Sequence, residues 1–307
     1  MGRNTVTVLD IAVRLLAWLI LAPLLPGIIT KVKAWVACRQ GPPVLQLYYD
    51  LFRLWNKGVV MSDLASPGFL IAPAVTWMAV VAAALLMPLG RAGCVFPFDG
   101  DVLLLIYLLA LARFCTAWGA METGSAFEGM GTVREVSFAV LAEIGIITAT
   151  LTLAIQSGTI TLQHLFAPLP GPSAALLAVG LFIILLAENC RVPFDDPTTH
   201  LELTMIHEVM VLDHSGPPLA LILHGASVKL MLFAAFLVQA VLPVGVMSPG
   251  ASLAVLALGV VLVAVAVGLV ESLTARLAFR RTPLLLTIGF LFCLFPLILT
   301  WMGGLHG

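Results

Sequence analysis

The chain has 307 residues, of which 61% are hydrophobic and 10% are charged, and its formal net charge is −1. A mean hydropathy of +1.10 lies far above that of a soluble domain and indicates a polytopic membrane protein. The near-neutral charge offers no basic surface for nucleic acid. The five cysteines occur singly, without the CxxC pairs of zinc or iron–sulfur sites, so we expect no metal and no cofactor in the chain itself.

Eight apolar stretches are long enough to cross the roughly 30 Å hydrocarbon core of a bilayer as helices. They cover residues 8–30, 68–90, 101–122, 134–156, 173–190, 218–244, 251–275 and 284–302. The first resembles a signal peptide only superficially, because Asp10 and Arg14 interrupt it and no small-x-small cleavage site follows. The sequence therefore predicts an all-α protein in which residues 1–307 form a single transmembrane domain.

Lysine and arginine residues gather in the connections that follow the odd-numbered stretches. These connections hold Lys31, Lys33, Arg39, Arg53, Lys57, Arg134, Arg191, Arg276, Arg280 and Arg281, whereas the opposite connections hold only Arg91. By the positive-inside rule, the basic connections face the cytoplasm and both termini lie outside.

The first basic connection, residues 31–66, is too long for a simple turn and contains an amphipathic segment. Its apolar face carries Val44, Leu47, Tyr48, Leu51, Leu54 and Trp55, and its polar face carries Gln46, Asp50, Arg53 and Lys57. This pattern predicts a cytoplasmic-side interfacial helix. A helix that merely docks on its own bundle would show the same pattern.

Several ionisable side chains fall inside the apolar stretches, where insertion costs roughly 2.5 to 3.5 kcal/mol each. Arg113, Glu143 and Lys229 are expected near mid-membrane, Glu143 about nine residues into a helix that starts near Arg134. The acids Glu122, Glu188 and Glu271 lie nearer the cytoplasmic ends. A buried carboxylate whose proton affinity depends on a nearby cation can relay protons, so these six residues form a candidate proton path. The alternative is a static ion pair of Glu143 with Lys229 or Arg113 that fixes helix packing.

The stretch from Glu188 to Gly216 holds six carboxylates, three histidines and one arginine, and residues 190–217 are the candidate functional loop on the cytoplasmic side. Asp196 followed by Pro197 predicts the start of a short helix that runs to about Leu212. One face of this helix would carry His200, Thr204, His207 and Val211, with Glu208 adjoining. Without an HExxH motif we predict no metal site, and histidines titrating near neutral pH favour proton exchange instead.

The segment from Glu188 to Asp195, ENCRVPFD, followed by Ser215-Gly216, resembles the E-x-x-R-x-P-F-D … S-G signature of the subunit 1 membrane proteins of respiratory complex I. The same family includes membrane subunits of group 4 membrane-bound [NiFe]-hydrogenases, of the hydrogenase-4 and formate hydrogenlyase type. Further similar elements are Arg39-Gln40-Gly41-Pro42-Pro43 with Gln46 and Asp50, Arg113, Gly124 to Phe127, Arg134-Glu135, Ala142-Glu143, and Glu271 with Ala275-Arg276.

This resemblance implies a membrane protein without a cofactor that connects a soluble redox arm to the membrane arm. It implies that Glu143 belongs to a proton path, that Arg39 caps a quinone crevice, and that Glu188, Arg191 and Asp195 belong to the loop facing the redox arm. The residues expected to dock that arm are Arg39, Arg134, Arg191, Asp195, Asp196, Glu202, His207 and Glu208. Its expected location is the prokaryotic cell (inner) membrane.

One departure separates the chain from complex I proteins. Their pattern P-E-A-E-x-E after P-F-D has Thr198 and His200 at its first two glutamate positions here, and only Glu202 remains. The difference favours the hydrogenase branch, with [NiFe]-hydrogenase large and small subunits, an iron–sulfur subunit, antiporter-like membrane subunits and membrane lipid as partners. The predicted function is anchoring and proton coupling; the alternatives are a quinone-site subunit of a complex I-like oxidoreductase, a free-standing transporter, or a purely structural anchor.

Overall fold

The computed structural model describes residues 8–61, 65–195 and 206–304, and every regular element in these ranges is a helix. The α-helices are α1 (Val8–Leu21), α2 (Leu24–Val36), α3 (Gln46–Trp55), α4 (Pro67–Leu86), α5 (Asp101–Met121), α6 (Ala126–Ser157), α7 (Leu162–Leu165), α8 (Gly171–Glu188), α9 (His207–Val211), α10 (Gly216–Val241), α11 (Pro249–Leu273) and α12 (Thr282–Gly304). Short 3-10 turns are η1 (Gly90–Ala92), η2 (Val244–Val246) and η3 (Phe279–Arg281).

Eight helical stretches in these ranges are long and apolar enough to cross a membrane, which confirms the predicted number. Prolines in the first turn open α4, α8, α10 and α11, where the missing N–H costs no helical hydrogen bond. At the start of α4, the Ser66 hydroxyl accepts a hydrogen bond from the Gly68 N–H at 3.1 Å.

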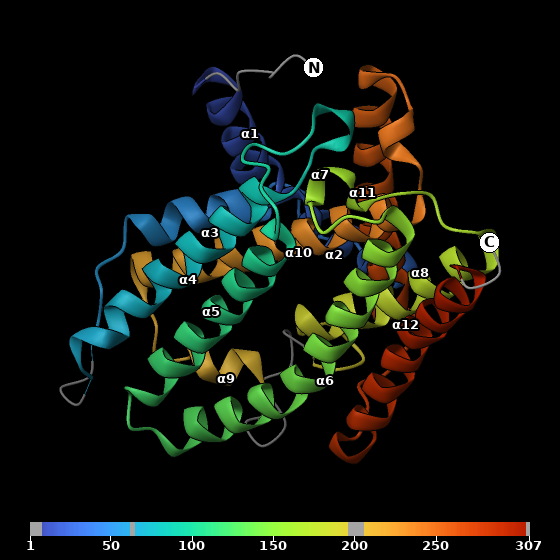
Figure 1. The fold of residues 1–307 in the computed structure, drawn as a ribbon. Coiled ribbons are helices and arrows are strands. Elements are labelled where there is room, and N and C mark those ends of the chain that lie inside the picture. The colour runs from blue at the N-terminus through green and yellow to red at the C-terminus, as the bar shows by residue number, and fades with distance from the viewer. Residues whose placement is uncertain (1–7, 62–64, 196–205, 305–307) are drawn as a thin grey trace.

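The bundle is built around α10, which is apolar on all sides and is the most deeply buried of the eight spans. α10 contacts α4, α8 and α11, α5 lies along α4, and α2 lies along α11. α12 packs against both α6 and α8, at the side of the bundle away from α4 (Figure 1). The arrangement brings the middle parts of α5, α6 and α10 to the C-terminal end of α8.

The first span differs from its predicted form. It consists of two helices, α1 and α2, separated at Ala22-Pro23, and it continues to Val36 rather than ending at residue 30. Pro23 has no N–H to continue the helical ladder, and the Leu25 N–H bonds to the Ala22 carbonyl instead. Lys33, which we expected in a connection, is therefore part of a helix that lies against α11.

The predicted start of the fourth span at Arg134 is wrong, because α6 begins at Ala126 and runs for 32 residues. The stretch from Gly124 to Gly131 predicted a break, yet only Gly124, with φ +69°, turns the chain. Gly131 serves packing: a Cβ there would lie 2.9 Å from the Ile206 carbonyl oxygen. Glu143 consequently lies near the middle of a long helix rather than nine residues from its start.

Two further elements were predicted in the polar connections. The amphipathic helix after residue 43 is present as α3, and its Leu51 and Leu54 pack against Ala220 of α10. Its Phe52 and Trp55 remain exposed, so α3 both docks on the bundle and presents aromatic side chains outward. The helix predicted from Pro197 to about Leu212 is described only in part, as α9; its proposed N-cap Asp196 lies outside the described residues.

Candidate functional site

Four ionisable side chains from four helices meet at the end of α8. Glu188 lies at the centre: one carboxylate oxygen pairs with the Arg113 guanidinium from α5, and the other lies 2.9 Å from the Lys229 ammonium from α10. Arg113 also pairs with Glu143 from α6. The two cations and two carboxylates of this four-helix ion cluster balance in charge, as buried ions must if their loss of hydration is to be offset.

The four-helix ion cluster contains one of the ion pairs that the sequence offered as the alternative to a proton path. Of the two pairings considered, Arg113 with Glu143 is present, and Lys229 pairs with Glu188 instead. The Lys229 ammonium also donates to the Glu188 backbone carbonyl at 2.7 Å. That bond satisfies the last turn of α8 and fixes the lysine at the point where the helix ends.

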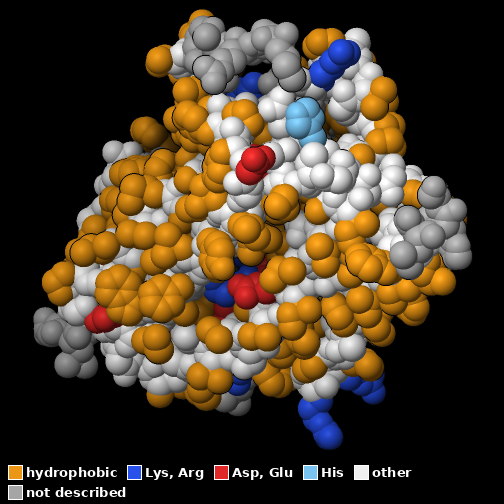
Figure 2. Space-filling model, in the orientation of Figure 1, with side chains coloured by type: hydrophobic (Ala, Val, Ile, Leu, Met, Phe, Trp, Pro, Cys, Tyr) orange, Lys and Arg blue, Asp and Glu red, His pale blue; other side chains and the backbone are white. Residues whose placement is uncertain are grey.

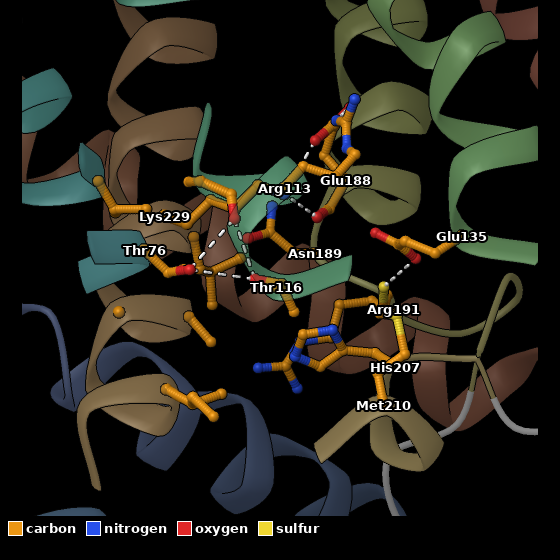
Figure 3. Close-up of a pocket in the computed structure, with 17 residues that line it drawn as sticks. Thr76, Arg113, Thr116, Glu135, Glu188, Asn189, Arg191, His207, Met210 and Lys229 are labelled. Atoms are coloured by element: carbon orange, nitrogen blue, oxygen red, sulfur yellow. Dashed lines mark hydrogen bonds and ion pairs between the residues drawn. The ribbon is translucent and has the colours of Figure 1, made fainter. Parts of the chain in front are cut away.

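A cavity of about 90 Å³ lies directly beside the four-helix ion cluster. Figure 3 shows polar side chains from several helices pointing into it, among them Thr76, Thr116 and Asn189 near the cluster and Arg191 and His207 on the loop side. The cavity has room for a few water molecules and enough polar groups to bind them. The cavity therefore lies between the four-helix ion cluster and the segment that follows α8.

Glu135 from α6 and Cys190 also line this cavity, and the Cys190 thiol donates to a Glu135 carboxylate oxygen at 3.4 Å. Glu135 faces the same space as Glu188 without pairing with it directly. The cavity thus holds a carboxylate on its loop side and another on its membrane side.

A second ion-pair group surrounds Glu271 at the end of α11. Its carboxylate lies 3.0 Å from the Lys33 ammonium of α2 and 3.5 Å from the Arg191 guanidinium. The Glu271 side chain is buried, and two helices and the loop converge on it. Because Arg191 also lines the cavity, this group is adjacent to the four-helix ion cluster on the loop side.

Asp195 holds both ends of the segment 196–205. One carboxylate oxygen accepts hydrogen bonds from the backbone N–H groups of Ile206 and His207, at 3.0 and 3.1 Å. The other pairs with Arg276 at 3.0 Å. Asp195 is buried, so its interactions are internal: it caps α9 and ties the functional loop to the segment after α11.

The four-helix ion cluster reaches the lateral surface of the bundle at one point. The Glu188 side chain is 1% exposed, whereas that of Glu143 is 36% exposed. Figure 2 shows acidic and basic side chains at the bottom of a hollow in an otherwise apolar face, in the region where α5 and α6 separate in Figure 1. Glu143, paired with Arg113, is therefore the member of the cluster whose carboxylate is most accessible from the lateral surface.

The remaining predicted site residues lie elsewhere. Glu122 accepts a hydrogen bond from the Trp118 indole at 2.8 Å and has no ion pair with the four-helix ion cluster. Arg39 is exposed at the rim of a groove beside α2, and Arg134 lies over the Phe279 ring. Glu208 is half-buried on α9. Asp196 and Glu202 fall outside the described residues.

Sequence reasoning gave no individual role to several residues that the structure places at these groups. Lys33 was assigned to a loop, although the apolar residues that continue around it to Val36 signal a longer helix. Glu128, which no motif singled out, is buried on α6 and accepts hydrogen bonds from the Thr123 hydroxyl and, at 3.4 Å, the Asp213 N–H. No local pattern could have paired Arg276 with Asp195, because 81 residues separate them.

His214, just before α10, is a buried histidine whose ring stacks on Phe69 at 4.0 Å. Burial lowers the pKa of His214 from 6.5 to about 4, so the folded protein keeps it neutral where an unfolded segment would be protonated. Its stabilising contribution is complete above pH 6.5 and is lost as the pH falls toward 4.

We therefore predict that acidification loosens the segment around α9. Between pH 7.5 and 5.5, the opening free energy of amides in residues 206–216 should fall by about 1 kcal/mol beyond the intrinsic exchange effect. Hydrogen exchange measures this directly. His214→Phe, which keeps the ring but cannot titrate, should remove the change, and His164→Phe at an exposed position of α7 should leave it intact. An equal pH effect in His214→Phe would contradict the assignment.

Known proteins share both the sequence pattern and the fold. The NADH dehydrogenase family matches residues 9–303. Hydrogenase-4 component C of Escherichia coli (strain K12) is 32% identical over 234 residues, which cover 74% of this chain and 73% of that protein. Formate hydrogenlyase subunit 4 of the same strain is 29% identical over 281 residues, covering 88% and 91%. An NADH-quinone oxidoreductase subunit of Phenylobacterium zucineum (strain HLK1) is 27% identical over 232 residues, covering 67% and 63%.

A solved structure supports the fold. A chain of the membrane-bound sulfane sulfur reductase, an archaeal respiratory membrane complex, superposes with a TM-score of 0.81 over 94% of this chain and 99% of that one. At 20% identity, the similarity concerns the fold alone.

Eight apolar stretches long enough to span a membrane, packed around charge-balanced ion pairs, define a polytopic membrane protein of the type found as a membrane subunit of respiratory complexes. The chain belongs to the NADH dehydrogenase family, and its relatives include membrane subunits of hydrogenase-4, formate hydrogenlyase and NADH-quinone oxidoreductase. The resemblance deduced from ENCRVPFD and Ser215-Gly216 is confirmed.

Proposed function

We propose that this chain anchors the soluble arm of a membrane-bound [NiFe]-hydrogenase complex and couples it to ion-translocating membrane subunits. The observation that supports this most directly is the continuous row of polar groups from the loop side of the cavity, through the four-helix ion cluster, to Glu143 on the apolar face. A static anchor has no need for such a row, since each buried charge costs free energy.

The exposed end of the row indicates a membrane partner. Glu143 is 36% exposed within the apolar belt, so a neighbouring protein must cover it with a polar group. We assign antiporter-like membrane subunits to this face, since they would accept the charge change. A free-standing transporter would have no partner subunit to cover Glu143, so the partial exposure of this carboxylate disfavours that alternative.

The end of this row of polar groups on the loop side of the cavity supports coupling to redox chemistry. Arg191 lines the cavity and also pairs with Glu271, so a shift of the loop would change the field at Glu188. Electron flow in the docked arm would move the loop, alter the proton affinities of Glu188 and Glu143, and pass the charge change outward. The arm would comprise the hydrogenase large and small subunits and an iron–sulfur subunit, on the cytoplasmic side, with both termini of this chain outside.

Co-purification tests the proposal. The complex is isolated in mild detergent through an affinity tag on this chain, its subunits are identified by mass spectrometry, and nickel is measured by elemental analysis. We expect a hydrogenase large subunit with stoichiometric nickel together with antiporter-like subunits. A nickel-free, quinone-reducing counterpart would overturn the hydrogenase assignment, and isolation of this chain alone would overturn the proposal as a whole.

For docking, we predict that Asp195→Ala weakens retention of the soluble arm, because α9 loses its cap and the loop loses its tie to Arg276. A lost cap costs about 1 kcal/mol, and a broken buried pair 3–5 kcal/mol. The arm recovered per membrane subunit, measured by quantitative mass spectrometry, should fall at least about tenfold. Arg276→Gln should give a smaller loss, because the backbone bonds of Asp195 remain. Unchanged recovery in Asp195→Ala would remove the loop from the docking surface.

A cavity of about 170 Å³ below α3 bears on the quinone-site alternative. Leu51, Trp55, Trp77 and His224 are among its lining residues. The Trp77 indole donates to His224 Nδ1 at 2.9 Å, and His224 Nε2 therefore carries the hydrogen that it donates to the Leu19 carbonyl at 3.0 Å. Since both ring nitrogens are occupied, the histidine offers no donor to a quinone carbonyl, which favours the hydrogenase assignment. Quinone-dependent turnover of the purified complex would reverse it.

A further inference from the structure

An apolar groove of about 260 Å³ lies between the first span and the pair α10 and α11. Trp18 and Leu21 of α1 form one wall, Leu253 and Ala257 of α11 form the other, and Leu89 closes one end. The groove is separate from the cavity beside the four-helix ion cluster, with which it shares no lining residue.

The groove is suited to hydrocarbon rather than water. Its walls are apolar side chains, and a smaller apolar cavity of about 150 Å³ is known to stay dry and to accept benzene or xenon. Leu21 and Leu253 on its rim are 45% and 46% exposed, so the groove opens on the lateral surface of the bundle. In a membrane, that surface faces acyl chains.

A basic side chain lies at the end of the groove that Leu89 closes. Arg91 follows Leu89 in the chain, and its N–H donates to the Ser252 hydroxyl at 3.2 Å, next to the groove residue Leu253. Its guanidinium donates to the Met247 carbonyl at 3.2 Å. Within the described residues no carboxylate pairs with Arg91, and the guanidinium retains donors directed to the surroundings.

The geometry points to a phospholipid site: an acyl chain of an anionic phospholipid fills the groove, and its phosphate binds Arg91. The acyl tail lies along the apolar walls of the groove beside Trp18, and the phosphate of the headgroup lies beside Arg91 at the end of the groove. Arginine binds phosphate through paired N–H donors and so selects an anionic headgroup over a neutral one. The site does not depend on the proposed function.

Photo-crosslinking tests this site. The tagged complex is purified in mild detergent, exchanged into nanodiscs, and exposed to phosphatidylglycerol or phosphatidylcholine with a diazirine at mid-chain; modified peptides are mapped by mass spectrometry. We expect labelling in peptides of α1 and α11 around Trp18 and Ala257, with a preference for phosphatidylglycerol of about fivefold, the value of one cation near a lipid headgroup.

Two matched pairs of variants separate tail from headgroup. Ala257→Trp fills the groove and should abolish the labelling, whereas Leu258→Trp, on the adjacent residue that does not line the groove, should leave it. Arg91→Gln should equalise the two lipids without abolishing labelling, and Arg280→Gln in η3, beyond the C-terminal end of α11, should change nothing. The proposal would be overturned if the Leu258→Trp and Ala257→Trp variants were labelled equally. It would also be overturned if the unmodified chain showed no preference for phosphatidylglycerol over phosphatidylcholine, or if a crosslink showed a helix of another protein in the groove.

Discussion

Replacing Glu188 by glutamine is expected to destabilise this protein more than any other single change in the four-helix ion cluster. Glu188 is shared by Arg113 and Lys229, so its neutralisation leaves two cations with one remaining carboxylate, Glu143. Breaking a buried pair on one side costs about 3–5 kcal/mol, because the orphaned charge stays in a medium of low polarity. We expect a marked fall in the melting temperature of the purified complex and in its yield from membranes.

Charge balance provides the control for this prediction. The double variant Glu188→Gln with Lys229→Gln leaves Arg113 paired with Glu143 and no net charge, so it should recover a large part of the lost stability. Glu122→Gln, which removes an acid bound to the Trp118 indole away from this cluster, should have a small effect. If Glu188→Gln melts at the temperature of the unmodified complex, Glu188 is not the centre that the contacts indicate.

Replacing Glu143 by glutamine is expected to separate redox activity from ion movement. Glu143 lies at the exposed end of the four-helix ion cluster, and Arg113 keeps Glu188 as a partner when it is neutralised, so the fold should survive. The amide can still accept a hydrogen bond but cannot carry a proton. Dye-linked hydrogenase activity of the assembled complex should stay within about twofold of the unmodified value, whereas ion translocation in vesicles should fall at least about tenfold, as for loss of a proton-transfer group.

A conservative variant makes this prediction specific. Glu143→Asp keeps a titratable carboxyl on α6 and should therefore show more ion translocation than Glu143→Gln. If Glu143 served packing alone, the shorter aspartate would give no such recovery. Subunit composition is measured in parallel, because loss of the membrane partner would also stop translocation. Full ion pumping in an intact Glu143→Gln complex would reduce Glu143 to a packing residue.

The two variants together distinguish coupling from anchoring. A structural anchor would respond to both with altered assembly and unchanged ratios of translocation to hydrogenase turnover. If the chain is a coupling subunit, Glu188→Gln should lower the stability of the complex, and Glu143→Gln should lower the ratio of ion translocation to hydrogenase turnover. The difference follows from position, since Glu188 is enclosed by two cations and Glu143 is partly exposed at the surface of the bundle.

Short stretches of the sequence predicted those elements whose structure depends mainly on their own residues. Proline and glycine spacing located most of the spans, and the apolar face of residues 44–55 predicted α3. The same reasoning failed at Gly131, where glycine permits contact with Ile206 rather than a turn. A glycine reports only that space or conformational freedom is needed, and whether a turn or a neighbouring backbone needs it is a tertiary property.

The amino-acid sequence by itself determined the all-α membrane class, the number of spans and, through ENCRVPFD, the family, because the energetic demands of a bilayer act on each apolar stretch separately. Only the tertiary structure decided that Glu188 and not Glu143 receives Lys229, that Lys33 and Arg191 share Glu271, and that Asp195 binds Arg276. Buried charges have to be balanced across helices, and which partners come within 3 to 4 Å depends on how the helices pack.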